Sequence, residues 1–189
     1  MNINFDIERF RNDPRGLIFV LSQLQRVGAW HLGHHREIEE IVCKTPSSAL
    51  KFCHLVSRAY GVSKDAEKVF VKNPSIGIRY LRLVGRSEFL EEKVQKRFWR
   101  KVLKSPDLAL EWSRAFGRRL PEGEEVFVSS IQRARDYSFY VIKGAFPENI
   151  HRMFVLRSFE NLEAWDKRYL TEYLRYAESS SKKRVADGH

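Results

Sequence analysis

The sequence has few of the features that mark a disulfide-stabilised or membrane-spanning protein. Its 189 residues include only two cysteines, Cys43 and Cys53, and two isolated cysteines without ligand spacing are typical of reduced side chains in a cytosolic core. The longest uninterrupted apolar run, residues 17–21, is far too short to cross a bilayer. We therefore expect neither a structural disulfide nor a contact with the membrane interior.

Catalytic signatures are missing as well. The chain has no Gly-rich phosphate loop, no Gly-x-Ser-x-Gly elbow, no His-Glu-x-x-His pattern and no dinucleotide fingerprint. We predict a protein that is not an enzyme, with no cofactor and no small-molecule substrate. Its first residues lack the basic-then-apolar pattern of a signal peptide, so a cytoplasmic location is expected.

One group of histidines suggests a metal site. His31, His34 and His35 lie close together in the sequence, and a three-residue step can place two imidazoles on one side of a turn. Gly33 interrupts the segment, however, and no cysteine is near in sequence. The preferred interpretation is a loop or capping role, and no metal site is predicted.

The most informative pattern that is present consists of four cap residues, each followed by proline. They are Asp13-Pro14, Thr45-Pro46, Asn73-Pro74 and Ser105-Pro106, with the prolines 32, 28 and 32 residues apart. The cap side chain can accept a hydrogen bond from an unpaired helix N–H, and proline brings a preset φ to the first helical position. Six residues after each proline stands a large apolar residue: Val20, Phe52, Tyr80 or Trp112. The spacing predicts a repeat that begins a helix at each proline.

The repeat predicts alternating short and long helices. After a first helix from Pro14 to about Gln25, the expected pairs are 36–44 with 46–59, 63–72 with 74–85, 88–104 with 106–117, and 121–131 with 133–143. Further helices are expected over 147–157 and 160–177. Left-handed C-caps are expected just past the long members, at Gly61, Gly85, Gly117 and Gly144.

These elements predict an all-α fold. We expect a right-handed stack of helix pairs, a short α-solenoid of about five repeats with a C-terminal capping helix. Residues 1–178 are expected to form a single helical-repeat domain. Residues 179–189 form a polar segment that lacks the apolar content to fold, so a disordered tail is expected there.

Three segments carry a resemblance to known repeats. They are Thr-Pro-Ser-Ser-Ala-Leu-Lys-Phe (45–52), Asn-Pro-Ser-Ile-Gly-Ile-Arg-Tyr (73–80) and Ser-Pro-Asp-Leu-Ala-Leu-Glu-Trp (105–112). These segments resemble the short helix-pair repeats, loosely HEAT-like, of uncharacterised phage, giant-virus and bacterial proteins. The resemblance covers about residues 13–145. It implies an α-solenoid used for macromolecular binding, and it carries over no active-site residue.

Positive charge is concentrated in the middle of the chain. The sequence has 34 Lys and Arg against 24 Asp and Glu, and residues 79–119 contain 12 basic and 5 acidic residues. In the expected helix 88–104, cations recur at steps of three and one, while apolar residues recur every four on the other side. The candidate nucleic-acid-binding residues are Arg79, Arg82, Arg86, Lys93, Lys96, Arg97, Arg100, Lys101, Lys104, Arg114, Arg118 and Arg119.

Two functional interpretations follow from this charge. The first is a nucleic-acid-binding module whose basic surface crosses the middle repeats; RNA or single strands are favoured, because no helix-turn-helix or zinc motif is recognisable. The second is a protein-interaction module that docks its basic face on an acidic partner, for example as a phage-type inhibitor of a host protein. Tyr80, Phe98 and Trp99 neighbour cations and would suit base stacking. The repeat, however, assigns Tyr80, Phe98 and Trp112 to the core.

Overall fold

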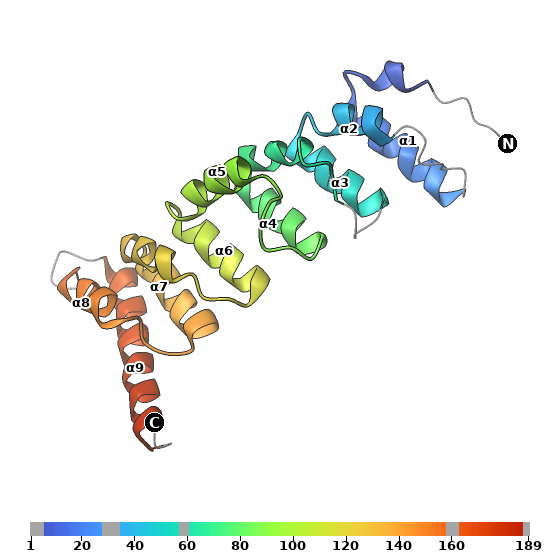
Figure 1. The fold of residues 1–189 in the computed structure, drawn as a ribbon. Helices are drawn as coiled ribbons and strands as arrows, with labels where there is room; N and C mark the ends of the chain where they lie inside the picture. The colour runs from blue at the N-terminus through green and yellow to red at the C-terminus, as the bar shows by residue number, and fades with distance from the viewer. Residues whose placement is uncertain (1–5, 28–34, 57–60, 158–162, 187–189) are drawn as a thin grey trace. The chain divides into compact units, whose positions relative to one another are not determined.

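The computed structural model describes residues 6–27, 35–56, 61–157 and 163–186 (Figure 1). Within these residues the regular elements are all helices, and no strand is present. The prediction of an all-α fold is confirmed. The chain divides into two compact units, Met1–Phe98 and Trp99–His189, which are described one at a time. The single domain over 1–178 stays a prediction.

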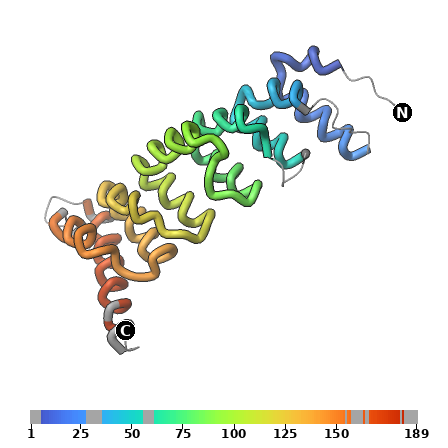
Figure 2. The backbone as a smooth tube through the Cα atoms, viewed as in Figure 1, coloured from blue at the N-terminus to red at the C-terminus, as the bar shows by residue number. Residues whose placement is uncertain are grey.

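The first unit is built on three long helices that pack in chain order. Its elements are η1 (Ile7–Phe10), α1 (Pro14–Arg26), α2 (His35–Val42), α3 (Pro46–Val56), η3 (Ala66–Lys72), α4 (Pro74–Leu83) and the start of α5 (Glu92–Val102). Helix α1 packs on α3, and α3 packs on α4 (Figure 2). The short η1, α2 and η3 lie against these long helices.

The second unit is centred on α7. Its elements are the end of α5, α6 (Pro106–Phe116), η4 (Pro121–Ser129), α7 (Ile131–Tyr137), η5 (Ser138–Ile142), α8 (Glu148–Arg157) and α9 (Ala164–Ala186). Helix α7 contacts α6, η4, η5 and α9. Because α9 continues to Ala186, the structure places a helix over residues 179–186, where a polar tail was expected.

The four expected helix starts are confirmed, and each has its capping hydrogen bond. The side chain of Asp13 accepts from the Gly16 N–H at 2.9 Å, and that of Thr45 accepts from the Ser48 N–H at 3.2 Å. Asn73 accepts from the Ile76 N–H at 3.3 Å, and Ser105 accepts from the Leu108 N–H at 3.4 Å. A side-chain oxygen followed by proline is thus sufficient to set where these helices begin.

Three of the four expected C-cap glycines have a left-handed backbone. The φ angles of Gly61, Gly85 and Gly117 are 64°, 70° and 62°. The expectation for Gly144 is wrong, because the left-handed residue is Lys143, with φ of 56°. The cause is local: residues 138–142 form a π-helical turn, so the chain leaves the helix one residue before the glycine.

Three of the four large positions of the repeat are buried as the spacing predicts, whereas Val20 in the first helix is half-buried. Phe52, Tyr80 and Trp112 are buried, as are the small residues three positions before them, Ala49, Gly77 and Ala109. The same two positions recur in α7 as Ala134 and Tyr137, both buried, although α7 begins at Ile131 and not at a proline. The expected start at 133 is therefore too late.

Other boundaries differ from the expectation. The expected helices 63–72 and 121–131 are the shorter 3₁₀ helices η3 and η4. Helix α5 begins at Glu92 and not at 88, because two backbone N–H groups before it are bonded to side chains. Phe89 N–H donates to Gln95 Oε1 at 2.8 Å, and Leu90 N–H donates to Glu67 Oε2 at 2.7 Å.

Candidate nucleic-acid interface

Helix α5 presents a basic face to solvent. Val94, Phe98 and Val102 are buried at intervals of four residues, so the opposite side of the helix lies outside. The exposed cations of α5 are Lys93, Lys96, Arg97, Arg100 and Lys101, and Lys104 is exposed in the turn that follows. The structure therefore brings all six predicted cations of this segment onto the solvent side.

At least three of the six cations on this basic face have no carboxylate partner among the described residues. Lys96 Nζ lies 2.5 Å from Glu92 Oε1, and both side chains are largely exposed. Such pairs contribute little stability and weaken with salt. Among the described residues, no carboxylate lies within ion-pair distance of Lys93, Arg97 or Arg100. These three cations are available to an anionic partner.

The predicted cations outside α5 belong to different units. Arg79 and Arg82 are exposed on α4 in the first unit. Arg114 is exposed on α6 in the second unit, and Arg118 is exposed just after that helix. Whether they extend the basic face of α5 stays a prediction.

Arg86 forms internal polar contacts in the first unit. Its Nη2 atom lies 2.5 Å from Glu67 Oε1 and 2.7 Å from the Tyr80 hydroxyl oxygen. The Tyr80 hydroxyl donates to the same carboxylate at 2.8 Å, and Glu67 is completely buried. A buried carboxylate requires such partners, since an unpaired buried charge is very costly. The main role of Arg86 is therefore internal.

Arg119 has a similar internal role in the second unit. Its Nε and Nη2 atoms each donate to the Glu124 carboxylate at 3.0 Å, in the two-pronged geometry that arginine favours. Glu124 is buried and also accepts from the Tyr137 hydroxyl at 3.3 Å. Burial raises the pKa of Tyr137 to about 12. Because Arg119 donates two hydrogen bonds to the Glu124 carboxylate, its main role is as the partner of that carboxylate.

The three aromatic residues that the repeat assigns to the core, Tyr80, Phe98 and Trp112, are buried as predicted, whereas Trp99 is half-buried. Tyr80 and Phe98 have no exposed surface, and Trp112 is 5% exposed. Tyr80 stacks on Phe70 at 4.1 Å between ring centroids, and Phe98 packs edge-on against Phe89 at 5.0 Å. None of the three rings is accessible for stacking on a base.

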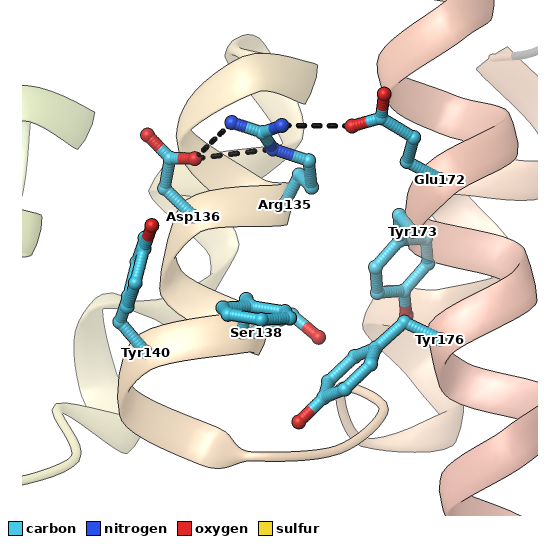
Figure 3. Close-up of a pocket in the computed structure, with 8 residues that line it drawn as sticks. Arg135, Asp136, Ser138, Tyr140, Glu172, Tyr173 and Tyr176 are labelled. Carbon is cyan, nitrogen blue, oxygen red and sulfur yellow. Dashed lines mark hydrogen bonds and ion pairs between the residues drawn. The ribbon is translucent and has the colours of Figure 1, made fainter.

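Accessible aromatic rings occur instead beside a cavity in the second unit. This cavity of about 300 Å³ lies between α7, η5 and α9. Figure 3 shows Arg135 bridging Asp136 and Glu172 at one end, with Tyr140 from η5 and Tyr173 and Tyr176 from α9 around the space. Phe139 and Tyr140 are 53% and 54% exposed, which is high for two adjacent rings.

Arg114, one of the predicted cations, contacts Tyr140, which lines this cavity. Its guanidinium carbon lies 4.2 Å from the centroid of the Tyr140 ring, which is a close cation–π contact. Arg114 remains exposed, so the same guanidinium can also meet a phosphate. A cation stacked on an exposed ring is a common element of single-strand binding surfaces.

Comparisons with protein-family models, curated proteins and solved structures find no match to this chain. They identify no repeat family, so the likeness to HEAT-type helix pairs stays a prediction. Any functional conclusion rests on the chemistry of the side chains described above.

Metal and thiol chemistry have little support in the described residues. No group of three or more His, Cys, Asp or Glu side chains among them is arranged to hold a metal ion, and His31 and His34 lie outside these residues. Cys43 and Cys53 are free thiols. Burial raises the pKa of Cys53 to about 12, so this thiol is a poor nucleophile. No described helix combines the length and apolar composition needed to cross a membrane.

Two features of the site were missed by sequence reasoning. The run Phe139-Tyr140-Val141-Ile142 is β-prone and lies where the repeat predicts a helix, and nothing in it signals a π turn. The internal role of Arg119 had a weak signal, because Glu124 is five residues away in sequence, whereas Arg86 and Glu67 are 19 residues apart. In both cases the glutamate precedes a core tyrosine by 13 residues. Glu67 with Tyr80 and Glu124 with Tyr137 have this spacing.

Proposed function

We propose that this protein is a non-enzymatic nucleic-acid-binding module that binds RNA or single strands. The observation that carries the proposal is the exposed basic face of α5, which lies opposite a buried apolar stripe. Lysine and arginine side chains on such a face neutralise phosphates and release their counterions. No catalytic residue, cofactor or metal is assigned.

The proposal divides the 12 predicted cations by role. Arg86 and Arg119 stabilise buried glutamates and are not part of the proposed binding surface. The remaining ten are exposed: Arg79, Arg82, Lys93, Lys96, Arg97, Arg100, Lys101, Lys104, Arg114 and Arg118. A single strand is favoured because a row of cations follows a backbone without reading a groove.

The proposed scaffold is a right-handed stack of about five helix pairs, closed by α9. Within the first unit α1 packs on α3 and α3 packs on α4, and within the second unit α6 packs on α7 and α7 packs on α9. The short members lie against them. The recurring cap, small residue and large residue support a common repeat, in which each pair buries its neighbour's apolar face.

The test is a binding titration with three charge reversals on α5. Lys93→Glu, Arg97→Glu and Arg100→Glu are combined, since all three side chains are exposed. Fluorescence anisotropy is measured with labelled single-stranded RNA, single-stranded DNA and duplex DNA at several salt concentrations. Wild-type protein is expected to bind single strands more tightly with a steep salt dependence, and the variant is expected to lose most of this affinity.

A matched control variant distinguishes an effect of the α5 face on affinity from an effect of net charge alone. Arg15→Glu, Lys51→Glu and Lys68→Glu change the charge equally at exposed positions on other elements. This variant is expected to retain most of the affinity. Retained binding in the α5 variant, with an unchanged helical circular dichroism spectrum, would contradict the proposal. Absent binding by wild-type protein at physiological salt would favour an acidic protein partner instead.

A further inference from the structure

The cavity beside η5 is lined by aromatic rings and by Arg135, Asp136 and Glu172, which belong to a larger polar network of balanced charge. Three arginines and three carboxylates form this network through successive ion pairs: Arg133, Arg135 and Arg168 with Asp107, Asp136 and Glu172. Arg135 is its centre, because Nη2 lies 2.6 Å from Asp136 Oδ1 and Nη1 lies 2.7 Å from Glu172 Oε2. Positive and negative charges balance, so the network attracts neither a cation nor an anion strongly.

The backbone beside the cavity is unusual. Ser138–Ile142 form a π-helical turn, and Lys143 ends it in the left-handed region with φ of 56°. The Ser138 hydroxyl donates to the Gly144 carbonyl and fixes this turn. π-helical turns and left-handed non-glycine residues are rare, carry a cost in stability and occur often at functional sites.

The π turn holds adjacent aromatic residues at the surface. The Phe139 ring packs edge-on against Tyr140 and tilted against Tyr176 from α9, each at 5.1 Å between centroids. More than half of the Phe139 surface remains exposed. The cluster is preorganised, since rings from two helices fix its geometry while leaving apolar area open to a ligand.

We propose that this cavity receives one unpaired nucleobase of the bound strand, which stacks on Phe139. Its volume of about 300 Å³ is at the lower end of ligand sites and suits a base or nucleoside. The Asp136 carboxylate can accept from base N–H groups, since Arg135 bonds to Oδ1, whereas the contact with Arg133 is made at Oδ2 and is longer, at 3.8 Å. Arg114, stacked on Tyr140, is placed to meet a flanking phosphate.

Charge balance decides between a base and an ammonium ion. Aromatic rings with carboxylates nearby can also bind methylated ammonium groups. Here both carboxylates that line the cavity are already paired with arginines, and the Tyr140 ring already carries the Arg114 guanidinium. A neutral flat ring with its own donors and acceptors fits this environment better than an added cation.

The inference rests on the proposed function, and one experiment separates the two. A labelled 12-nucleotide single-stranded RNA is compared with the same strand carrying abasic riboses at its central positions, which keeps every phosphate. Wild-type protein is expected to bind the intact strand roughly 5- to 150-fold more tightly, the range of one base–aromatic stack. Phe139→Ala is expected to lose this preference, and Phe139→Trp is expected to keep it.

Two controls complete the experiment. Phe19→Ala removes a ring that is 64% exposed on α1, far in sequence from the cavity, and is expected to leave the preference intact. The triple α5 reversal is expected to weaken binding to both strands equally. If the intact and abasic strands bind alike, or Phe139→Ala keeps the preference with an unchanged circular dichroism spectrum, the base site is overturned while strand binding stands. If wild-type protein binds neither strand, both proposals fail.

Discussion

Glu67 and Tyr80 share a hydrogen bond of 2.8 Å in the interior of the first unit, where neither side chain has any exposed surface. In the second unit, Glu124 and Tyr137 repeat the relationship at 3.3 Å. Both tyrosine hydroxyls also accept from a backbone N–H, of Val62 in one unit and Leu120 in the other. Each unit therefore has the same polar centre within its core.

Removal of the Glu67 carboxylate is expected to destabilise the protein strongly. Glu67→Ala leaves the Arg86 guanidinium and the Leu90 N–H without their acceptor. Breaking one partner of a buried ion pair typically costs about 3–5 kcal/mol. Urea denaturation followed by circular dichroism measures the change, with the exposed Glu122→Ala as the control. A loss equal to that of the control would show that the pair has no structural importance.

Loss of a helix cap is expected to have a smaller effect. Asn73→Ala removes the acceptor for the Ile76 N–H at the start of α4, and such a change typically costs about 1 kcal/mol. Asn73→Asp keeps a side-chain oxygen and is expected to stay near wild-type stability. Equal midpoints of thermal unfolding for the Ala and Asp variants would contradict the capping role.

Stability is expected to fall at alkaline pH. Burial raises the pKa of Cys53 from 9.0 to about 12, and burial likewise raises that of Tyr137 from 10.0 to about 12. The unfolded chain releases these protons first, so their contribution is complete below about pH 9 and is lost as pH rises toward 12. The free energy of unfolding, measured by urea titration from pH 8 to 11, is expected to decline.

The variant Cys53→Ala tests the thiol's share of this decline. It is expected to be less stable at neutral pH, because it removes a buried atom, but to show a shallower fall between pH 9 and 11. A decline as steep as in the wild type would assign the whole effect to other groups, including Tyr137.

The salt dependence of strand binding is expected to report the number of phosphates that α5 contacts. For single strands, the slope of log affinity against log salt changes by about 0.7 per phosphate contact. The triple reversal at Lys93, Arg97 and Arg100 is therefore expected to lower the slope by about 2 or more. Weaker binding with an unchanged slope would indicate that these side chains do not contact phosphates.

Sequence reasoning predicted the parts of this fold that depend on neighbouring residues. A cap side chain and the proline after it act within one turn, so four helix starts were located correctly. Burial of Phe52, Tyr80 and Trp112 followed from spacing alone. The basic face of α5 was predictable for the same reason, since helical periodicity places charged and apolar residues on opposite sides.

The parts that failed depend on contacts distant in sequence. Arg86 was counted as a surface cation, and only the fold reveals Glu67, 19 residues earlier, as its partner. The aromatic cavity requires α9 to lie beside α7, which periodicity within either helix does not indicate. The π turn is the exception, because it is held by a local hydrogen bond from Ser138 to the Gly144 carbonyl, yet no pattern in the sequence indicates it.

The Glu67 carboxylate accepts hydrogen bonds from three groups that follow it in the chain, on Tyr80, Arg86 and Leu90. One side chain on η3 thus joins the middle of α4, the turn after it and the segment before α5. These segments cannot open one at a time without uncovering the charge. The Leu90 amide, although outside any helix, should therefore exchange with deuterium as slowly as the core amides of α4, because both become exposed only when the whole group unfolds.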